Sequence, residues 1–155
     1  MIIREGEFED PQVRDLLAMH ASGMLANSPV DQCHFLDLSG LQAPDVRFFT
    51  LWDGEALVAM GAYRDHGGGL AEIKSMRTVP ARLGQGHGRA MLMHILAEAI
   101  AAGMTRISLE TGSGAAFEAA LALYRAHGFV DCPPFADYQA TDFNQFLTLD
   151  LCKEP

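Results

Sequence analysis

Three glycines at alternate positions, Gly84, Gly86 and Gly88, are the feature that most restricts how this chain can fold. They follow a β-rich run that ends at Val79 and precede a segment, 89–102, whose apolar residues recur every three or four positions. Glycine has no Cβ atom, so its backbone N–H groups can approach a ligand closely, and a helix N-terminus carries about half a positive charge. The spacing therefore predicts a strand, an anion-binding turn and a helix, with phosphate as the expected anion.

Two familiar phosphate-binding loops can be compared with this spacing. A Walker loop ends in Gly-Lys-Ser/Thr, and the chain contains no Gly-Lys pair, so that loop is excluded. A dinucleotide-binding turn requires Gly-x-Gly-x-x-Gly, whereas Arg89 or Met91 occupies the position of its third glycine. Glu110 nevertheless falls roughly where a ribose-binding acid would lie. A dinucleotide-binding oxidoreductase therefore stays open as an alternative, although the sequence predicts one strand–helix–strand unit rather than several.

The remaining pattern predicts a mixed α/β fold. Asp53-Gly54 lies between two β-rich runs, which is the strongest short-range signal of a hairpin. Asp10-Pro11 supplies an N-cap followed by proline at the first helical position. We expect short helical turns and loop over residues 28–45, and a loop at Gly67–Gly69. Strands are expected from residue 2 and at 48–52, 56–63, 72–79, 106–110, 129–132 and 145–151, and helices at 11–24, 89–102 and 115–126.

Composition limits the class of protein. The chain has 155 residues without repeats or a linker, so we expect 1–155 to form one domain. Eleven basic against twenty acidic side chains give a net charge of -9, which argues against a nucleic-acid partner because such binding rests on clustered Lys and Arg. No run approaches the ~20 apolar residues that span a membrane, and nothing marks export. The three cysteines are odd in number and far apart, which disfavours disulfide bonds and favours a reducing cytoplasm. The six histidines do not have the spacing of metal ligands.

Residues 83–88 read Leu-Gly-Gln-Gly-His-Gly, and residues 120–129 read Ala-Leu-Ala-Leu-Tyr-Arg-Ala-His-Gly-Phe. Both resemble the GNAT family of acetyl-CoA-dependent N-acetyltransferases, whose main motif is Arg/Gln-x-x-Gly-x-Gly/Ala at a strand-to-helix junction. Residues 108–114, Ser-Leu-Glu-Thr-Gly-Ser-Gly, look like one bacterial branch whose members mostly have no assigned acceptor. Two positions depart from the family pattern, since Leu83 replaces the usual Arg or Gln and Phe117 replaces a frequent asparagine.

The resemblance implies the GNAT fold, with a mixed central β-sheet, an antiparallel N-terminal half, a parallel central strand pair that splays to hold the cofactor, and flanking helices. It implies an acyltransferase that moves an acetyl group from acetyl-CoA to an amine of a small molecule or peptide by direct attack. Backbone groups on the strand would pair with the pantetheine arm, and the glycine turn would cradle the pyrophosphate. A catalytically silent CoA-binding domain is the second alternative. The implied cofactor-binding residues are Met76, Arg77, Thr78, Gly84, Gln85, Gly86, His87, Gly88 and Arg89.

Two residues are candidates for catalysis. Tyr124 stands where the family often keeps a tyrosine near the cofactor sulfur, so we expect it to protonate the leaving thiolate as a general acid. A phenol pKa of about 10 is close enough to a thiol pKa of about 8.5 for that transfer. The acceptor ammonium must lose a proton, and Glu72, expected to share a strand face with Lys74 and Met76, is the candidate base. The alternatives are that Tyr124 is a core residue, that Glu72 is a strand charge paired with a lysine, and that Glu110 is the base.

The acceptor side is less defined by the sequence. His20, His34 and Asp37 fall in the region that shapes the acceptor pocket in the family, and exposed loop positions are the simpler interpretation of all three. The aromatic-rich segment 135–146 could pack on a second copy of the chain, which leaves a homodimer open.

Overall fold

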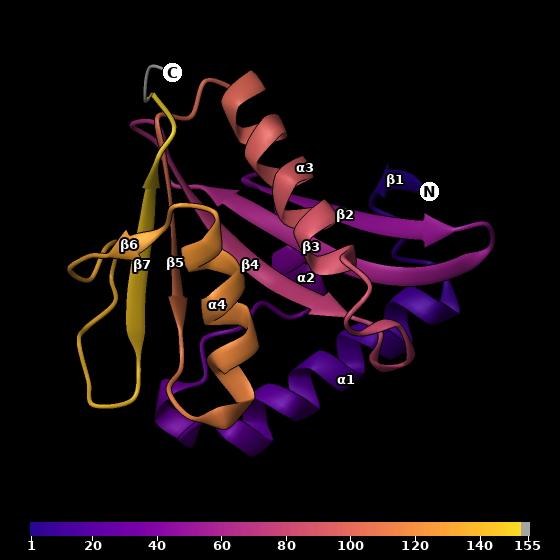
Figure 1. The fold of residues 1–155 in the computed structure, drawn as a ribbon, viewed down its shortest axis with the longest axis horizontal. Coiled ribbons are helices and arrows are strands. Elements are labelled where there is room, and N and C mark those ends of the chain that lie inside the picture. The colour runs from indigo at the N-terminus through magenta and orange to yellow at the C-terminus, as the bar shows by residue number, and fades with distance from the viewer. Residues whose placement is uncertain (153–155) are drawn as a thin grey trace.

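The computed structural model describes residues 1–152, apart from the side chain of Val30. One seven-stranded sheet, in the order β1-β2-β3-β4-β5-β7-β6, forms the centre of the molecule (Figure 1). The strands are β1 (Ile2–Glu5), β2 (Val46–Asp53), β3 (Ala56–Asp65), β4 (Leu70–Thr78), β5 (Arg106–Thr111), β6 (Val130–Asp131) and β7 (Gln145–Asp150). The helices are α1 (Pro11–Asn27), α2 (Leu38–Leu41), α3 (His87–Ala101) and α4 (Glu118–Ala126), with short 3-10 turns at Val30–Gln32, Pro80–Arg82 and Ala115–Phe117.

Strands β4 and β5 form the parallel pair of the described sheet, and they pair over only part of their length. The register joins Leu70 to Arg106 and ends at Glu72 and Ser108. Beyond these residues the two strands diverge toward their C-terminal ends, as Figure 1 shows. Strands β1 to β4 pair with one another in antiparallel fashion. The expected fold class, with an antiparallel N-terminal half and a parallel central pair that splays, is therefore confirmed.

Apolar side chains cover both faces of the sheet. Phe48 and Phe49, adjacent in β2, point into different clusters because side chains alternate along a strand. Phe49 belongs to the larger cluster, which includes Met91 of α3 and Tyr124 of α4. Phe48 belongs to a second cluster with Val13 of α1. The sheet is thus enclosed between α3 and α4 on one side and α1 and α2 on the other, which explains why its central strands are apolar on both faces.

A β-bulge in β4 corrects one expectation about the site. Ser75 has a φ of 57°, and the β3–β4 register moves from Ala62↔Lys74 to Met60↔Arg77, which adds a residue to β4. The extra residue reverses the alternation, so Met76 packs in the cluster under α3 and does not share the face of Glu72 and Lys74 as predicted. Its sulfur fills the space above Gly61, where a Cβ atom would lie 2.6 Å from Met76 Sδ.

Other differences from the expected elements lie at their ends. The third helix begins at His87 rather than residue 89, and the predicted helix over 115–126 is a 3-10 turn followed by α4. In the hairpin, Asp53 pairs with Ala56, so the two loop residues are Gly54 and Glu55. Gly54 has a φ of 59° while Glu55 is not in the left-handed region, as in a turn that needs positive φ only at its first central residue.

Helix α1 is held against β4 by a buried histidine. Asp10 caps the helix by accepting a hydrogen bond from the N–H of Gln12 at 2.8 Å, and Pro11 follows it. Two turns further, His20 is 9% exposed, and its Nδ1 accepts a hydrogen bond from Arg77 Nε at 2.9 Å. Burial, and then the nearby Arg77 charge, lower the pKa of His20 to about 4, so the ring is neutral at pH 7.

This buried ring predicts a pH-dependent stability. The folded-state pKa of His20 lies below the unfolded value of about 6.5, so its contribution is complete above pH 6.5 and is lost as the pH falls toward 4. The shift corresponds to about 3 kcal/mol of unfolding free energy. A His20→Gln variant keeps an oxygen that can accept from Arg77 but does not titrate. Urea unfolding at pH 7.5 and 4.5 should show a smaller acid loss in the variant than in the wild type, and equal losses would contradict the assignment.

Candidate active site

A cleft of about 580 Å³ opens where β4 and β5 diverge. Its walls are β4 from Glu72 to Thr78, the end of β5 from Leu109 to Thr111, the glycine turn, and α4. Residues of α1 and of the segment before α2, among them His20 and His34, also line it. Because residues from both faces of the sheet line it, one cavity reaches both sides through the gap that the short β4–β5 ladder leaves.

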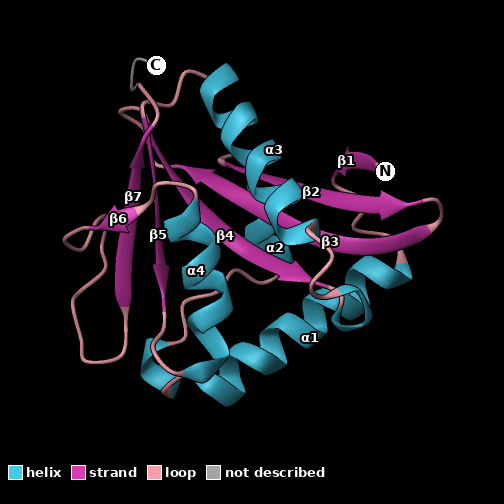
Figure 2. Cartoon of the chain, in the orientation of Figure 1, coloured by secondary structure: helices cyan, strands magenta, loops and turns pink. Residues whose placement is uncertain are grey.

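The glycine turn lies in the loop that enters α3 (Figure 2), and its glycines line this cleft. Gly84 and Gly86 have φ values of 74° and 84°, a conformation that glycine adopts without steric cost. Gly86 is the N-cap of α3 and provides no side-chain cap, so the first N–H groups of the helix stay free for a ligand. Together with the positive end of the helix dipole, these groups make an anion site.

The predicted cofactor residues of this turn fall into two groups. Gly84, Gly86, Gly88 and Arg89 line the cleft, whereas Gln85 and His87 do not. The His87 ring is 5% exposed, and its Nε2 lies 3.3 Å from Gln85 Oε1. These two residues can therefore face a ligand in the cleft through their backbone only.

The two positions that depart from the family motif carry apolar side chains in the structure. Leu83 is 65% exposed and offers no polar group, and Arg82 is engaged by Asp53 Oδ2 at 2.9 Å. Arg89, exposed at the cleft wall, is the remaining cation of the turn. Phe117 is buried and packs edge-to-face on Phe143, with ring centroids 5.6 Å apart. It fills the core in place of a polar contact.

The strand residues of the predicted cofactor site lie beyond the end of the β4–β5 ladder. Met76, Arg77 and Thr78 line the cleft, and their backbone has no partner on β5. The side chain of Arg77 lies toward α1, where a Cβ atom on Gly23 would be 2.9 Å from its Nη2. Burial lowers the pKa of Arg77, and no carboxylate pairs with it among the described residues. The guanidinium is thus a half-buried positive charge at the α1 end of the cleft.

Tyr124 of α4 lies inside the cleft wall. The residue is 5% exposed, and its ring packs on Phe129 with centroids 5.5 Å apart. Its hydroxyl makes no side-chain hydrogen bond within the described part of the chain, so it is free to serve a bound molecule. Burial raises the pKa of Tyr124 well above its usual value, which keeps the phenol protonated at neutral pH.

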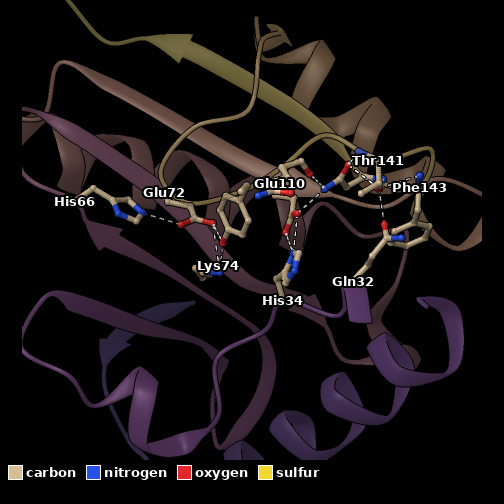
Figure 3. Close-up of polar contacts among 11 residues, drawn as sticks. Gln32, His34, His66, Glu72, Lys74, Glu110, Thr141 and Phe143 are labelled. Atoms are coloured by element: carbon tan, nitrogen blue, oxygen red, sulfur yellow. Dashed lines mark hydrogen bonds and ion pairs between the residues drawn. The ribbon is translucent and has the colours of Figure 1, made fainter. Parts of the chain in front are cut away.

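Glu72 lies at the point where the strands separate, and its carboxylate is fully engaged (Figure 3). The residue is 1% exposed. One oxygen lies 2.8 Å from His66 Nε2, and the other accepts from the Tyr138 hydroxyl at 2.7 Å and lies 3.3 Å from Lys74 Nζ. Lys74 Nζ also donates to the Tyr138 hydroxyl at 2.7 Å. Burial, followed by the Glu72 charge, raises the pKa of Tyr138, so that hydroxyl keeps its proton.

Glu110, at the end of β5, holds a second buried carboxylate close to the first. Its oxygens lie 2.7 and 2.8 Å from Nδ1 of His34, and Asn144 Nδ2 donates to one of them at 3.0 Å. Figure 3 shows His34 and Glu110 pointing toward one another from different parts of the chain. Asn144 is fixed in turn, because its Oδ1 accepts from the N–H of Thr141 at 2.8 Å.

Tyr138 and Asn144 are the residues that sequence reasoning missed. Both belong to the long segment between β6 and β7, and no local motif marks them. Aromatic rings of the same segment pack within this chain, with Phe135 against Tyr138 and against Phe146 of β7 at centroid distances of 5.3 and 5.9 Å. A homodimer formed through this segment stays a prediction.

Two further findings concern the described residues as a whole. No group of three or more His, Cys, Asp and Glu side chains among them is arranged to hold a metal ion. In the same part of the chain, no helix is long and apolar enough to cross a membrane.

Comparisons with known proteins agree with this architecture. The model of the acetyltransferase (GNAT) family matches residues 12–129. The chain is 43% identical over 151 residues to YedL of Escherichia coli K12, an uncharacterized N-acetyltransferase, covering 97% of this chain and 95% of that one. It is 39% identical over 151 residues to YsnE of Bacillus subtilis 168, also an uncharacterized N-acetyltransferase, covering 97% and 100%.

Among solved structures, a Klebsiella pneumoniae protein assigned as an acyl-CoA N-acyltransferase superposes with a TM-score of 0.81 at 26% identity, covering 97% of each chain.

The alternative of a dinucleotide-binding oxidoreductase is wrong, because such a fold needs a largely parallel sheet and the family match is to another class. The chain belongs to the GNAT family of acetyl-CoA-dependent N-acetyltransferases.

Proposed function

We propose that this N-acetyltransferase holds acetyl-CoA along the open edge of β4 and passes the acetyl group to an amine that enters from the α1 side. Acetyl transfer from acetyl-CoA is the activity of the family to which the chain belongs. The observation that carries the proposal is the cleft itself, which joins an anion-binding turn, an unpaired strand edge and Tyr124 in one cavity.

The cofactor site is proposed to be built mainly from backbone groups. The amides of a pantetheine arm need hydrogen-bond partners, and the N–H and C=O groups of residues 76–78 lack them on the β5 side. The N–H groups of residues 84–89, at the N-terminus of α3, would hold the pyrophosphate, and the Arg89 side chain would add a positive charge. When bound, acetyl-CoA supplies the activated acetyl group as a thioester.

Tyr124 is proposed as the group that protonates the leaving thiolate. It is protonated at neutral pH, lines the cleft, and has a hydroxyl that is not bound elsewhere in the described chain. A thiolate, whose conjugate acid has a pKa of about 8.5, would take that proton as the phenol in turn recovers one from the acetylated nitrogen.

Glu72 stays a prediction as the catalytic base, and its contacts favour a positioning role. Both oxygens are occupied by donors, so an incoming ammonium would have to displace a hydrogen bond to reach them. We propose that Glu72 holds Lys74 and Tyr138 in place at the cleft wall.

The acceptor is proposed to carry an anionic group besides its amine. Arg77 lines the α1 end of the cleft as a half-buried cation without a carboxylate partner in the described chain, and its neighbour His20 is neutral. A partly desolvated cation gains most from an anion that the ligand brings. This supports a small carboxylate-bearing amine, such as an amino acid, over an uncharged amine.

The free thiols of Cys33, Cys132 and Cys152 support the proposed cytoplasmic location.

The cofactor proposal is tested by ligand-induced stabilisation. Acetyl-CoA at 100 times its dissociation constant should stabilise the wild type by about 2.7 kcal/mol, seen as a rise in melting temperature, and NAD should not. Gly86→Ala adds a methyl group to a left-handed residue of the turn, so it should weaken the response. Gly6→Ala is the matched control, since Gly6 has a φ of 86° and a Cβ atom there would also meet nothing within 4 Å. A response to NAD alone, or equal responses of both variants, would count against the site.

The role of Tyr124 is tested by removing its hydroxyl. Tyr124→Phe should lower kcat by about 100-fold, because a general acid contributes roughly 10² to 10⁴, and the dissociation constant of acetyl-CoA should stay the same. Tyr63→Phe is the control, since Tyr63 is buried in the same apolar cluster and lies outside the cleft wall. Thiol release with the best amine of a panel measures both variants, and an unchanged kcat for Tyr124→Phe would exclude the acid role.

The acceptor proposal predicts a preference within matched pairs. Amino acids should be acetylated with a kcat/KM about 10 to 100 times that of their amides, the range that a charge-assisted hydrogen bond supplies. Arg77→Gln, which keeps a donor for His20, should abolish this preference while the stabilisation by acetyl-CoA persists. Equal rates for acids and amides in the wild type would show that the acceptor carries no anionic group at this position.

A further inference from the structure

We propose that His34, oriented by Glu110, is the base that takes the proton from the acceptor ammonium. This inference rests on the proposed function, because it assigns a role in acetyl transfer to the cleft already described. A base is needed there, since a primary amine with a pKa of about 10 is protonated at neutral pH and has no free electron pair for attack.

The contact between the two residues fixes which nitrogen of the ring can act. Nδ1 of His34 lies 2.7 and 2.8 Å from the two oxygens of Glu110, so Nδ1 carries the hydrogen and donates it to the carboxylate. Nε2 is then the nitrogen with the free electron pair, and it has no side-chain partner among the described residues. A histidine held by a carboxylate at Nδ1 is the arrangement that presents Nε2 as a base in hydrolytic triads.

Burial divides the two roles between the two residues. The Glu110 side chain is 8% exposed, whereas the His34 side chain is 35% exposed. Both residues line the cleft that also contains Tyr124. An acceptor can therefore reach the imidazole, while the carboxylate stabilises the positive ring that forms when Nε2 takes a proton.

The carboxylate is itself held rigidly. Asn144 Nδ2 donates to Glu110 Oε2 at 3.0 Å and to the carbonyl oxygen of Gln139 at 2.8 Å. The ring of His34 also packs against Tyr138, with centroids 5.2 Å apart and a tilt of 45°. Contacts from β5 and from the β6–β7 segment thus define both the position and the orientation of the imidazole, as a proton acceptor requires.

Two titratable side chains face the imidazole of His34 from other parts of the chain. Glu110 faces it from β5, and Tyr138 faces it from the segment between β6 and β7. Through the Tyr138 hydroxyl this segment is joined to Glu72 and Lys74 of β4, whose charges are paired with each other. Glu110 is therefore the charge in direct contact with the ring.

In the proposed reaction His34 takes a proton from the acceptor, and Tyr124 transfers a proton to the leaving sulfur. Nε2 of His34 accepts one proton from R–NH3+, which leaves R–NH2 with an electron pair. The nitrogen bonds to the acetyl carbon as the carbon–sulfur bond breaks, and the electrons of that bond leave on sulfur. Tyr124 gives a proton to the sulfur and recovers one from the acetylated nitrogen, and His34 returns its proton to solvent. The products are the N-acetyl amide, CoA-SH and one proton.

The first test is the pH dependence of acetyl transfer by His34→Gln, using the amine of the panel with the highest kcat/KM. At pH 7 the variant should lose about 100-fold in kcat, the lower end of what a general base supplies. Above pH 10 the amine deprotonates in solution, so the loss should shrink to a few-fold. Glu110→Gln should show the same trend with a smaller loss. His94→Gln, on α3 with its ring against Phe49 and outside the cleft wall, should behave as the wild type.

A loss that is equal at every pH would overturn the proposal, because it would indicate a structural role for His34. Unchanged kinetics would overturn it as well. In both cases stabilisation by acetyl-CoA separates the proposals: a wild type that acetyl-CoA does not stabilise defeats the cofactor site itself, whereas a normal stabilisation of His34→Gln leaves that site intact and defeats only the base.

A second measurement does not depend on the acceptor. Diethyl pyrocarbonate modifies unprotonated imidazole nitrogens, and peptide mass mapping identifies the modified ring. His34 should react several-fold faster than His127, whose Nδ1 lies 2.8 Å from the carbonyl oxygen of Leu123. Glu110→Gln should slow the reaction at His34. A His34 ring that reacts no faster than His127 would overturn the assignment even if no amine of the panel were acetylated.

Discussion

The short parallel ladder between β4 and β5 is the constraint on which the rest of the molecule depends. Three residues of each strand pair, and the remainder of β4 leaves its edge open. Unpaired backbone groups in a protein interior cost free energy, so an open edge between two buried strands persists only where a ligand or water supplies the missing partners. The bulge at Ser75 adds to the effect, because it turns Met76 into the core and Arg77 toward α1.

Two buried carboxylates lie beside that gap. Glu72 and Glu110 come from the two strands that diverge, and each contacts at least one partner from a segment far away in the chain, Tyr138 for Glu72 and His34 for Glu110. An isolated buried carboxylate would be strongly destabilising, so the donors His66, Lys74, Tyr138, His34 and Asn144 are necessary partners. The segment between β6 and β7 supplies two of them, which explains why a stretch with little regular structure is nevertheless packed on the sheet.

The sequence predicted the glycine turn and the elements around it much better than the side-chain contacts on the other wall of the cleft. The alternating glycines predict the turn into α3 from local steric rules alone, and the strand and helix positions follow from apolar periodicity. The sequence did not predict the bulge at Ser75, because serine is not a residue type that indicates a left-handed conformation. Simple alternation of side chains along the strand therefore placed Met76 on the same face as Glu72. The pairing of His34 with Glu110 also escaped, since these residues are 76 positions apart and only the tertiary fold brings them together.

The proposed donor and acceptor sides of the cleft are formed by different kinds of chemical group. The proposed donor side uses main-chain groups of β4 and of the glycine turn, which side-chain replacement leaves largely in place, as the presence of Leu83 and Phe117 at motif positions illustrates. The proposed acceptor side uses side chains from five separate segments of the chain, namely α1, the segment before α2, β4, β5 and the segment between β6 and β7. Side-chain substitutions on the proposed acceptor side can therefore change the shape and charge of that side of the cleft while the backbone groups of the glycine turn and of β4 stay in place.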